Sequence, residues 1–186
     1  MSRFALRFTL LLLTALPGCG DGVPPRSVQT AQRALQLARP QQALDALAGE
    51  EDRSDIRYFR GLALQELGQA SAARAEFEAA QDHDDHPRHQ AALLRLRLFQ
   101  RDLSAANELI ELEYAYPSSA PVRLACVYAY EALSIRLTAD GKPQAAASHR
   151  RGARTALETA LSLSAAIPEF HTVLLDFAQH YGFDQR

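Results

Sequence analysis

Residues 54–87, SDIRYFRGLALQELGQASAARAEFEAAQDHDDHP, predict two helices separated by a turn. The first half carries apolar residues at helical spacing, and Gly68 follows as a residue suited to the turn after a helix. The second half is rich in alanine and glutamate, which favour helix. Small residues recur where two helices must touch, at Gly61, Ala73 and Ala80. Each helix therefore leaves an apolar stripe that needs a neighbour.

This pattern resembles a tetratricopeptide repeat, in which larger residues fill the gaps between the small contact residues. The larger residues here are Tyr58, Leu64, Leu67 and Phe77. The resemblance implies an all-α fold, a right-handed superhelical stack of antiparallel helix pairs. In such a stack the units share a core and form a concave wall, mainly from the first helix of each pair.

The same spacing of small and large residues continues on both sides of this central unit. We expect units at about 27–50, 54–87, 88–119 and 120–166, with a capping helix over the exposed end of the stack at 168–181. That makes about three to four repeats plus a cap. Arg101 stands where the third unit would carry its turn glycine.

The beginning of the chain has the pattern of an export signal over residues 1–18. Arg3 and Arg7 precede an apolar run, Phe8–Leu16, which is too short for a bilayer that needs about 20 apolar residues. The run leads into Leu16-Pro17-Gly18-Cys19, which resembles the bacterial lipobox. The alternative is an ordinary signal peptide with an incidental cysteine.

The lipobox resemblance implies that the mature protein begins with an acylated Cys19. Residues 19–26 would then be the lipidated cysteine and a flexible linker, and residues 27–186 the helical domain. The six linker residues 20–25 span at most roughly 20 Å, so the domain would lie close to the lipid surface. Gly20 follows the cysteine in place of the Asp that tends to retain a lipoprotein at the inner membrane. The resemblance thus favours the outer membrane, facing the periplasm, in a bacterium with two membranes.

Charge argues against nucleic acid as a partner. The whole chain has 20 basic and 22 acidic residues; loss of residues 1–18 removes two arginines and no acid, leaving 18 against 22, a formal −4. A basic group on one expected helix, His149, Arg150, Arg151 and Arg154, is interpreted as a solvated face.

The only dense group of potential metal ligands runs from Asp82 to His89. Its weak candidate ligands, His83, His86 and His89, are spaced by three residues, and histidine can bind Zn²⁺. Pro87 breaks any helix that would align them, so a polar loop between two units is favoured over a metal site.

No catalytic motif accompanies this group. The sequence lacks a Gly-rich phosphate loop, a G-x-S-x-G elbow and an HExxH helix, so we expect neither an enzyme nor a cofactor. His171 and His180 are expected to pack at a surface or edge of the last helix. Cys126 has apolar neighbours and is interpreted as a core residue, with a reactive thiol as the alternative.

The repeat resemblance points to the concave wall as the partner-binding face, and the residues expected there are Tyr58, Leu62, Gln65, Arg95 and Phe99. The two aromatic residues could instead belong to the core. The first hypothesis is a membrane-anchored adaptor that holds other exported or envelope proteins, for example during assembly of a secretion, pilus or outer-membrane complex. The alternative is a lipoprotein that binds a metal at the His/Asp loop or a small ligand in the fourth hairpin.

Overall fold

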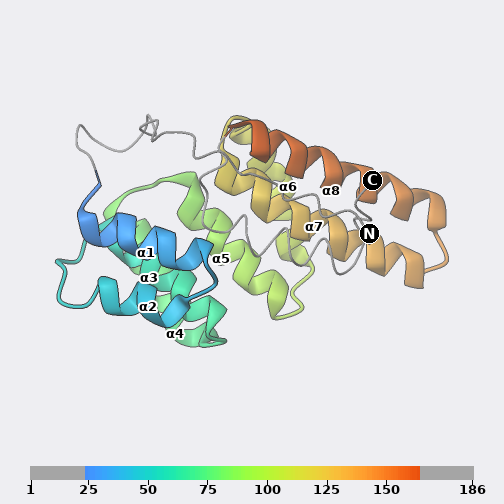
Figure 1. Ribbon diagram of the computed structural model, residues 1–186. Coiled ribbons are helices and arrows are strands. Elements are labelled where there is room, and N and C mark those ends of the chain that lie inside the picture. The colour runs from blue at the N-terminus through green and yellow to red at the C-terminus, as the bar shows by residue number, and fades with distance from the viewer. Residues whose placement is uncertain (1–23, 164–186) are drawn as a thin grey trace, which may run out of the picture.

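The computed structural model describes residues 24–163, and this range is all-α, without a strand (Figure 1). The predicted all-α fold class is thus confirmed. The helices are α1 (Arg26–Gln36), α2 (Pro40–Ala46), α3 (Ser54–Glu66), α4 (Ala70–His83), α5 (Pro87–Phe99), α6 (Ser104–Ala115), α7 (Ala120–Ala139) and α8 (Pro143–Leu163). The export signal, Cys19 and the expected capping helix lie outside the described residues.

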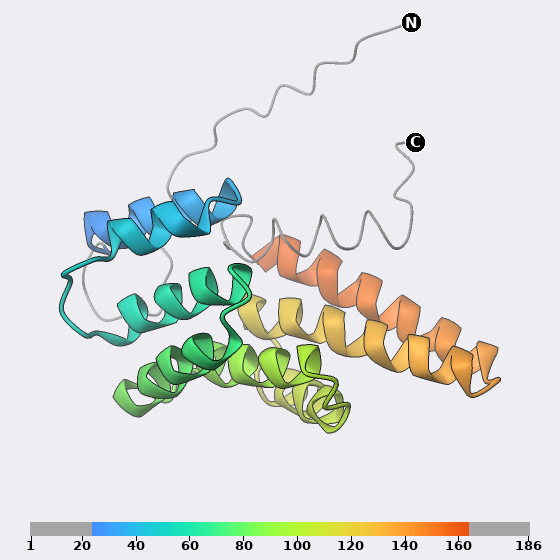
Figure 2. The same ribbon diagram turned by 90° about the horizontal axis from the view of Figure 1, so that it is seen from below.

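The helices form consecutive pairs, and each helix packs against the next one along the chain. The first helices also meet each other, since α1 contacts α3 and α5 contacts α7. Figure 2 shows the α7–α8 hairpin extending beyond the shorter pairs, because its two helices are the longest of the described set. The consecutive pairs are α1–α2, α3–α4, α5–α6 and α7–α8.

Proline opens several of these helices. Pro40 and Pro87 stand at the first positions of α2 and α5, and α8 begins with Pro143. Proline suits a first turn because the amide hydrogen it lacks would have no partner within the helix. Since the residue before proline is also restricted away from helix, these prolines mark the boundary with the preceding helix, within a pair at Pro40 and Pro143 and between two pairs at Pro87.

All four turns within the pairs close in the same way. The second residue after each first helix has a positive φ, and these residues are Ala38, Gly68, Arg101 and Gly141. The amide that follows each of them donates to the carbonyl five residues earlier, at 2.9 to 3.1 Å. This Schellman arrangement satisfies carbonyls that the end of a helix leaves unpaired. The four pairs therefore share one local geometry although their turn sequences differ.

We expect Arg101→Gly to raise the free energy of unfolding by about 0.5–1 kcal/mol, because Arg101 has a φ of 69°, which L-residues with a Cβ adopt at a cost. Urea denaturation would measure the gain. The matched control is Gly68→Ala, where a Cβ would meet no atom within 4 Å, so the expected loss of about 1 kcal/mol comes from the backbone alone. A loss in both variants would contradict the assignment of strain to Arg101.

The central pair confirms a close helix contact at Gly61. A Cβ built on Gly61 in α3 would lie 2.5 Å from Cε1 of Phe77 in α4. Phe77 is fully buried, as are Ala73 and Ala80 on the same helix. Leu67 departs from the expected gap-filling role: it lies at the end of α3 and is 36% exposed.

The interior of residues 24–163 is divided into two apolar clusters rather than the one continuous core expected from the sequence. One cluster joins α1 to α4, and the other joins α6 to α8. Helix α5 belongs to both: Ala92 and Leu96 pack on the first cluster, whereas Ala91, Leu94 and Leu98 pack on the second. This explains why α5 is apolar on more than one side, as a helix enclosed by two layers must be.

Candidate functional site

The structure brings some of the predicted partner-binding residues together on the first helices. Nη2 of Arg95 on α5 donates to Oε1 of Gln65 on α3 at 3.2 Å. Farther along α5, the ring of Phe99 meets the ring of Tyr128 on α7 edge-on, with centroids 5.1 Å apart. We call the surface formed by Gln65, Arg95, Phe99, Tyr128 and Ile135 the first-helix strip.

Exposure within the predicted set is uneven. Tyr58, Leu62 and Arg95 are each 3–4% exposed, whereas Phe99 is 47% exposed and Gln65 is half-buried. Tyr58 packs among Phe59, Phe77 and His89, with ring centroids 5.4 to 6.0 Å apart. Tyr58 and Leu62 therefore belong to the apolar core, and Gln65 and Phe99 are the members of the predicted set with substantial exposed surface.

Arg95 is a buried cation that forms no ion pair with another described residue. Within residues 24–163 its guanidinium bonds to the neutral amide of Gln65, and its buried Nε has no hydrogen-bond partner there. No carboxylate in that part of the chain forms an ion pair with it. A buried charge without a counterion is costly, so this position favours an anionic group nearby.

The histidine-rich junction between α4 and α5 forms a hydrogen-bonded cluster. His89 is fully buried, and its Nε2 accepts from Nε of Arg88 at 3.0 Å. Its Nδ1 therefore carries the proton and donates to the carbonyl oxygen of Asp84 at 3.2 Å. The Asp84 carboxylate also accepts from the hydroxyl of Ser54, which ties the start of α3 to this junction. Burial, and after it the neighbouring Arg88 charge, lower the pKa of His89 to about 4.

The three candidate metal ligands do not converge. His83 is exposed at the end of α4, the Nδ1 of His86 accepts from the backbone amide of Arg88 at 3.2 Å, and both ring nitrogens of His89 are engaged. Within the described range, no three His, Cys, Asp or Glu side chains are placed to hold a metal ion. Pro87 follows His86 at the first position of α5, so His83 at the end of α4 and His89 on α5 belong to different helices.

We expect His89 to make stability fall in acid. Its folded pKa of about 4 lies below the ordinary value of 6.5, so the folded state binds fewer protons. The contribution is complete above pH 6.5 and is lost as the pH falls towards 4; between pH 8 and pH 5 the loss should be about 2 kcal/mol. Urea denaturation at several pH values measures it, and His89→Gln should flatten the profile. An unchanged slope in that variant would disprove the role of His89.

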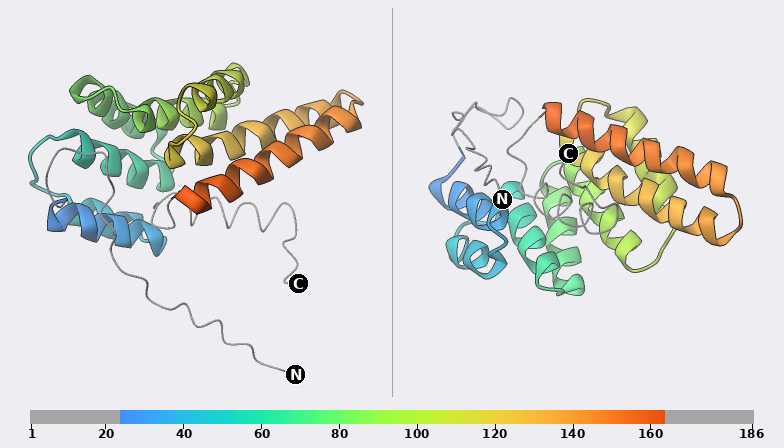
Figure 3. Two further views of the ribbon diagram at one scale, coloured as in Figure 1. Left: turned by 90° about the horizontal axis from the view of Figure 1, so that it is seen from above. Right: turned by 45° about the vertical axis from the view of Figure 1, so that its right-hand side comes forward.

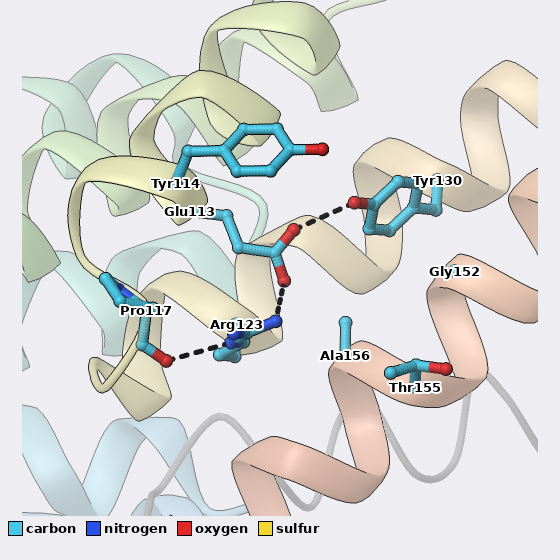
Figure 4. Close-up of a pocket in the computed structure, with 8 residues that line it drawn as sticks. All are labelled: Glu113, Tyr114, Pro117, Arg123, Tyr130, Gly152, Thr155 and Ala156. Atoms are coloured by element: carbon cyan, nitrogen blue, oxygen red, sulfur yellow. Dashed lines mark hydrogen bonds and ion pairs between the residues drawn. The ribbon is translucent and has the colours of Figure 1, made fainter.

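A pocket of about 330 Å³ lies between α6, α7 and α8 (Figure 4). Its lining residues are Glu113, Tyr114, Pro117, Arg123, Tyr130, Gly152, Thr155 and Ala156. Thr155 and Ala156 face Glu113 from α8 across the open space, and Tyr114 is 80% exposed at the rim. The volume falls at the lower end of the range for small-molecule sites.

The polar centre of the pocket is the carboxylate of Glu113, which is only 6% exposed. Oη of Tyr130 donates to Oε2 of Glu113 at 2.8 Å, and Nη1 of Arg123 donates to Oε1. Nε of Arg123 also donates to the carbonyl of Pro117 at 3.1 Å, which ties the α6–α7 turn to this centre. Burial raises the pKa of Tyr130, and its hydrogen bond to the Glu113 carboxylate raises it further. Glu113 therefore joins α6 to α7 through two donors.

Gly152 shapes the same pocket from α8. A Cβ at this position would lie 3.1 Å from the Tyr130 ring, so the glycine lets the ring lie close to the α8 backbone. Sequence reasoning missed this group. One signal was available: Glu113 follows Leu109 by four residues, so a charge occupies the buried stripe of α6.

Cys126 lies beneath the polar centre and is fully buried, as predicted for a core residue. Its Sγ donates to the carbonyl of Leu109 at 3.1 Å. Burial raises the pKa of the thiol, and the nearby charge of Glu113 adds to the effect. These surroundings disfavour the thiolate that a reactive cysteine requires.

None of the helices between residues 24 and 163 combines the length and the apolar character that a membrane span requires. The fold and these sites define an all-α protein built from antiparallel helix pairs. The sequence matches no family model and no curated protein, and no solved structure matches the fold at a significant level.

Proposed function

We propose that this chain is a lipid-anchored protein of the tetratricopeptide-repeat type that holds another exported protein close to a bacterial membrane. The N-terminal sequence supports the anchor, since charges, a short apolar run and Leu16-Pro17-Gly18-Cys19 occur in that order. Two or three acyl chains on Cys19 would suffice for stable attachment. The short linker would then keep the helical domain near the membrane surface.

The observation that carries the adaptor role is the first-helix strip. It combines exposed apolar surface, at Phe99 and Ile135, with the buried and incompletely paired Arg95 beside Gln65. Aromatic and arginine residues dominate the energetics of protein interfaces, where a few buried contacts supply most of the affinity. A peptide or helix with apolar side chains and an acidic group would fit this strip.

A site-specific photocrosslinker tests the adaptor role. The probe p-benzoylphenylalanine would replace Phe99 in the membrane-anchored chain, and the matched control would carry it at Glu111, an exposed position of α6 outside the first-helix strip. We expect one discrete exported protein to be captured at position 99 and not at position 111. Capture of the same proteins at both positions, or of none, would count against the proposal.

The lipid anchor has an independent test. Cells grown with a fatty-acid analogue should label the wild-type chain, and Cys19→Ser should lose the label because the acylated thiol and amine belong to that residue. The control Cys126→Ser removes the buried cysteine and should keep the label. Equal labelling of the wild type and Cys19→Ser would exclude acylation at Cys19.

The pocket around Glu113 favours the alternative function, a small-ligand-binding lipoprotein. A metabolite panel in a thermal shift assay would test it, since a ligand at 100 times its dissociation constant stabilises by about 2.7 kcal/mol. Thr155→Trp would fill the pocket from its exposed α8 wall and should abolish the shift. A shift that persists in this variant would come from another site.

A further inference from the structure

Two apolar side chains of the first-helix strip are left exposed to solvent in the part of the chain that the structure describes. Phe99 is 47% exposed and Ile135 is 59% exposed. Ile135 follows Tyr128 by seven residues on α7, which puts the two on the same side of the helix. The strip thus has exposed apolar side chains on α5 and α7, with the Arg95 cation and Gln65 on its α3 side.

A segment with an apolar stripe and negatively charged side chains would complement the first-helix strip. Covering the exposed Phe and Ile side chains lowers the free energy of the protein. A carboxylate close to the buried guanidinium of Arg95 would also be stabilising, because it supplies the missing counterion. In residues 24–163 only the neutral amide of Gln65 bonds to that guanidinium.

Residues 164–186 of the same chain have this chemistry. Their sequence, SAAIPEFHTVLLDFAQHYGFDQR, carries apolar residues at helical spacing, namely Phe170, Val173, Leu174, Phe177 and Tyr181. Glu169 and Asp176 are seven residues apart, so on a helix both acids would flank the same edge of the apolar stripe. We propose that residues 168–183 bind the first-helix strip of their own molecule as an amphipathic segment, which a protein partner would have to displace.

The connection is long enough for this placement. Helix α8 ends at Leu163, and Figure 3 shows that end, coloured red, beside the start of α7. The start of α7 packs in the same cluster as α5, through residues such as Val122 and Leu94. Phe170 follows Leu163 by seven residues, a distance along the chain that can span at most about 25 Å.

The competing location is the outer face of α8, at the end of the stack, where the sequence pattern first suggested a cap. That face is polar. Arg151, Arg154 and Glu158 are exposed on it, and Nε of Arg154 forms an ion pair with Oε1 of Glu158 at 2.8 Å. These three described side chains offer an apolar stripe no apolar contact, whereas the first-helix strip offers two large exposed apolar side chains.

Crosslinking within the purified full-length chain tests the proposal. The p-benzoylphenylalanine probe at position 99, activated in dilute protein, should form intramolecular adducts that peptide mapping assigns to residues 168–183. The same probe at Arg154 should not. Adducts from position 154 to 168–183 would locate the segment at the end of the stack and overturn the proposal. Intermolecular adducts at position 99, which indicate a second copy, or no adduct there would overturn it as well.

Hydrogen exchange in the full chain provides a measurement without a probe. Phe99→Asp should speed amide exchange in residues 168–183 about fivefold, because the charge removes an apolar contact. The control Tyr114→Asp changes an 80% exposed aromatic residue away from the strip and should leave that exchange unchanged. Equal exchange in wild type and Phe99→Asp would disprove the contact. A failed contact would leave the adaptor proposal standing, since capture of a partner at Phe99 needs no intramolecular segment.

Discussion

Phe77→Ala should lower the free energy of unfolding by about 3–5 kcal/mol, the largest loss that we expect from a single substitution. The Phe77 ring is fully buried, lies against Gly61 and has its centroid 6.0 Å from that of Tyr58. Its removal leaves a cavity where α3 and α4 meet, and the enclosed neighbours can close it only in part. Urea denaturation followed by circular dichroism measures the loss.

Gly61 supplies the matched test of the same contact from the opposite helix. Gly61→Ala should cost about 1–3 kcal/mol, because the new methyl group would overlap the Phe77 ring. The double variant Gly61→Ala/Phe77→Leu should lose less than the sum of the single changes, since a smaller side chain leaves room for the methyl group. Additive losses would mean that the two residues do not share a contact.

Arg123→Met should destabilise the protein by about 3 kcal/mol, because it leaves the carboxylate of Glu113 buried without its ion-pair partner. Glu113 is 6% exposed, and Tyr130 is its only other donor among the described contacts. The hydrogen bond from Arg123 to the Pro117 carbonyl would be lost too. Denaturation at constant pH measures the effect.

Two further variants separate the ion pair from simple packing. Tyr130→Phe removes one hydrogen bond to Glu113 and should cost only about 1–1.5 kcal/mol. Glu113→Leu combined with Arg123→Met removes both charges and should recover most of the loss, because apolar residues replace buried ion pairs at little cost. A double variant less stable than Arg123→Met alone would show that the carboxylate needs no counterion.

The helix pairs could be predicted from the sequence because their causes are local. Prolines at helix starts and glycines such as Gly68 and Gly141 act within a few residues of their own positions. The same local logic pointed to Arg101 as a departure, and the structure gives that residue the positive φ that glycine has elsewhere. The contact of Gly61 with Phe77 was also predictable, since it lies within one pair.

The sites were harder to predict because they form between pairs. Tyr58, Leu62 and Arg95 were expected on the partner-binding face, yet neighbouring helices bury all three. The pattern of apolar residues along a single helix does not reveal which of its residues a neighbouring helix will cover. The Glu113–Arg123–Tyr130 group likewise depends on the crossing of α6 with α7. His89 was identified as a weak metal candidate, but its ring is held by Arg88 and Asp84.

The position of α5 in two apolar clusters limits how the protein can be divided into fragments. A polypeptide that ends at Asp84 lacks Ala92 and Leu96, so its Phe77 cluster would be open on one side; one that ends at Gln100 keeps both residues. The complementary piece that starts at Arg101 would in turn lack Leu94 and Leu98. Either fragment that contains α5 removes apolar contacts from the other fragment. Unfolding that begins at one end of the molecule should therefore propagate through this helix to the opposite end.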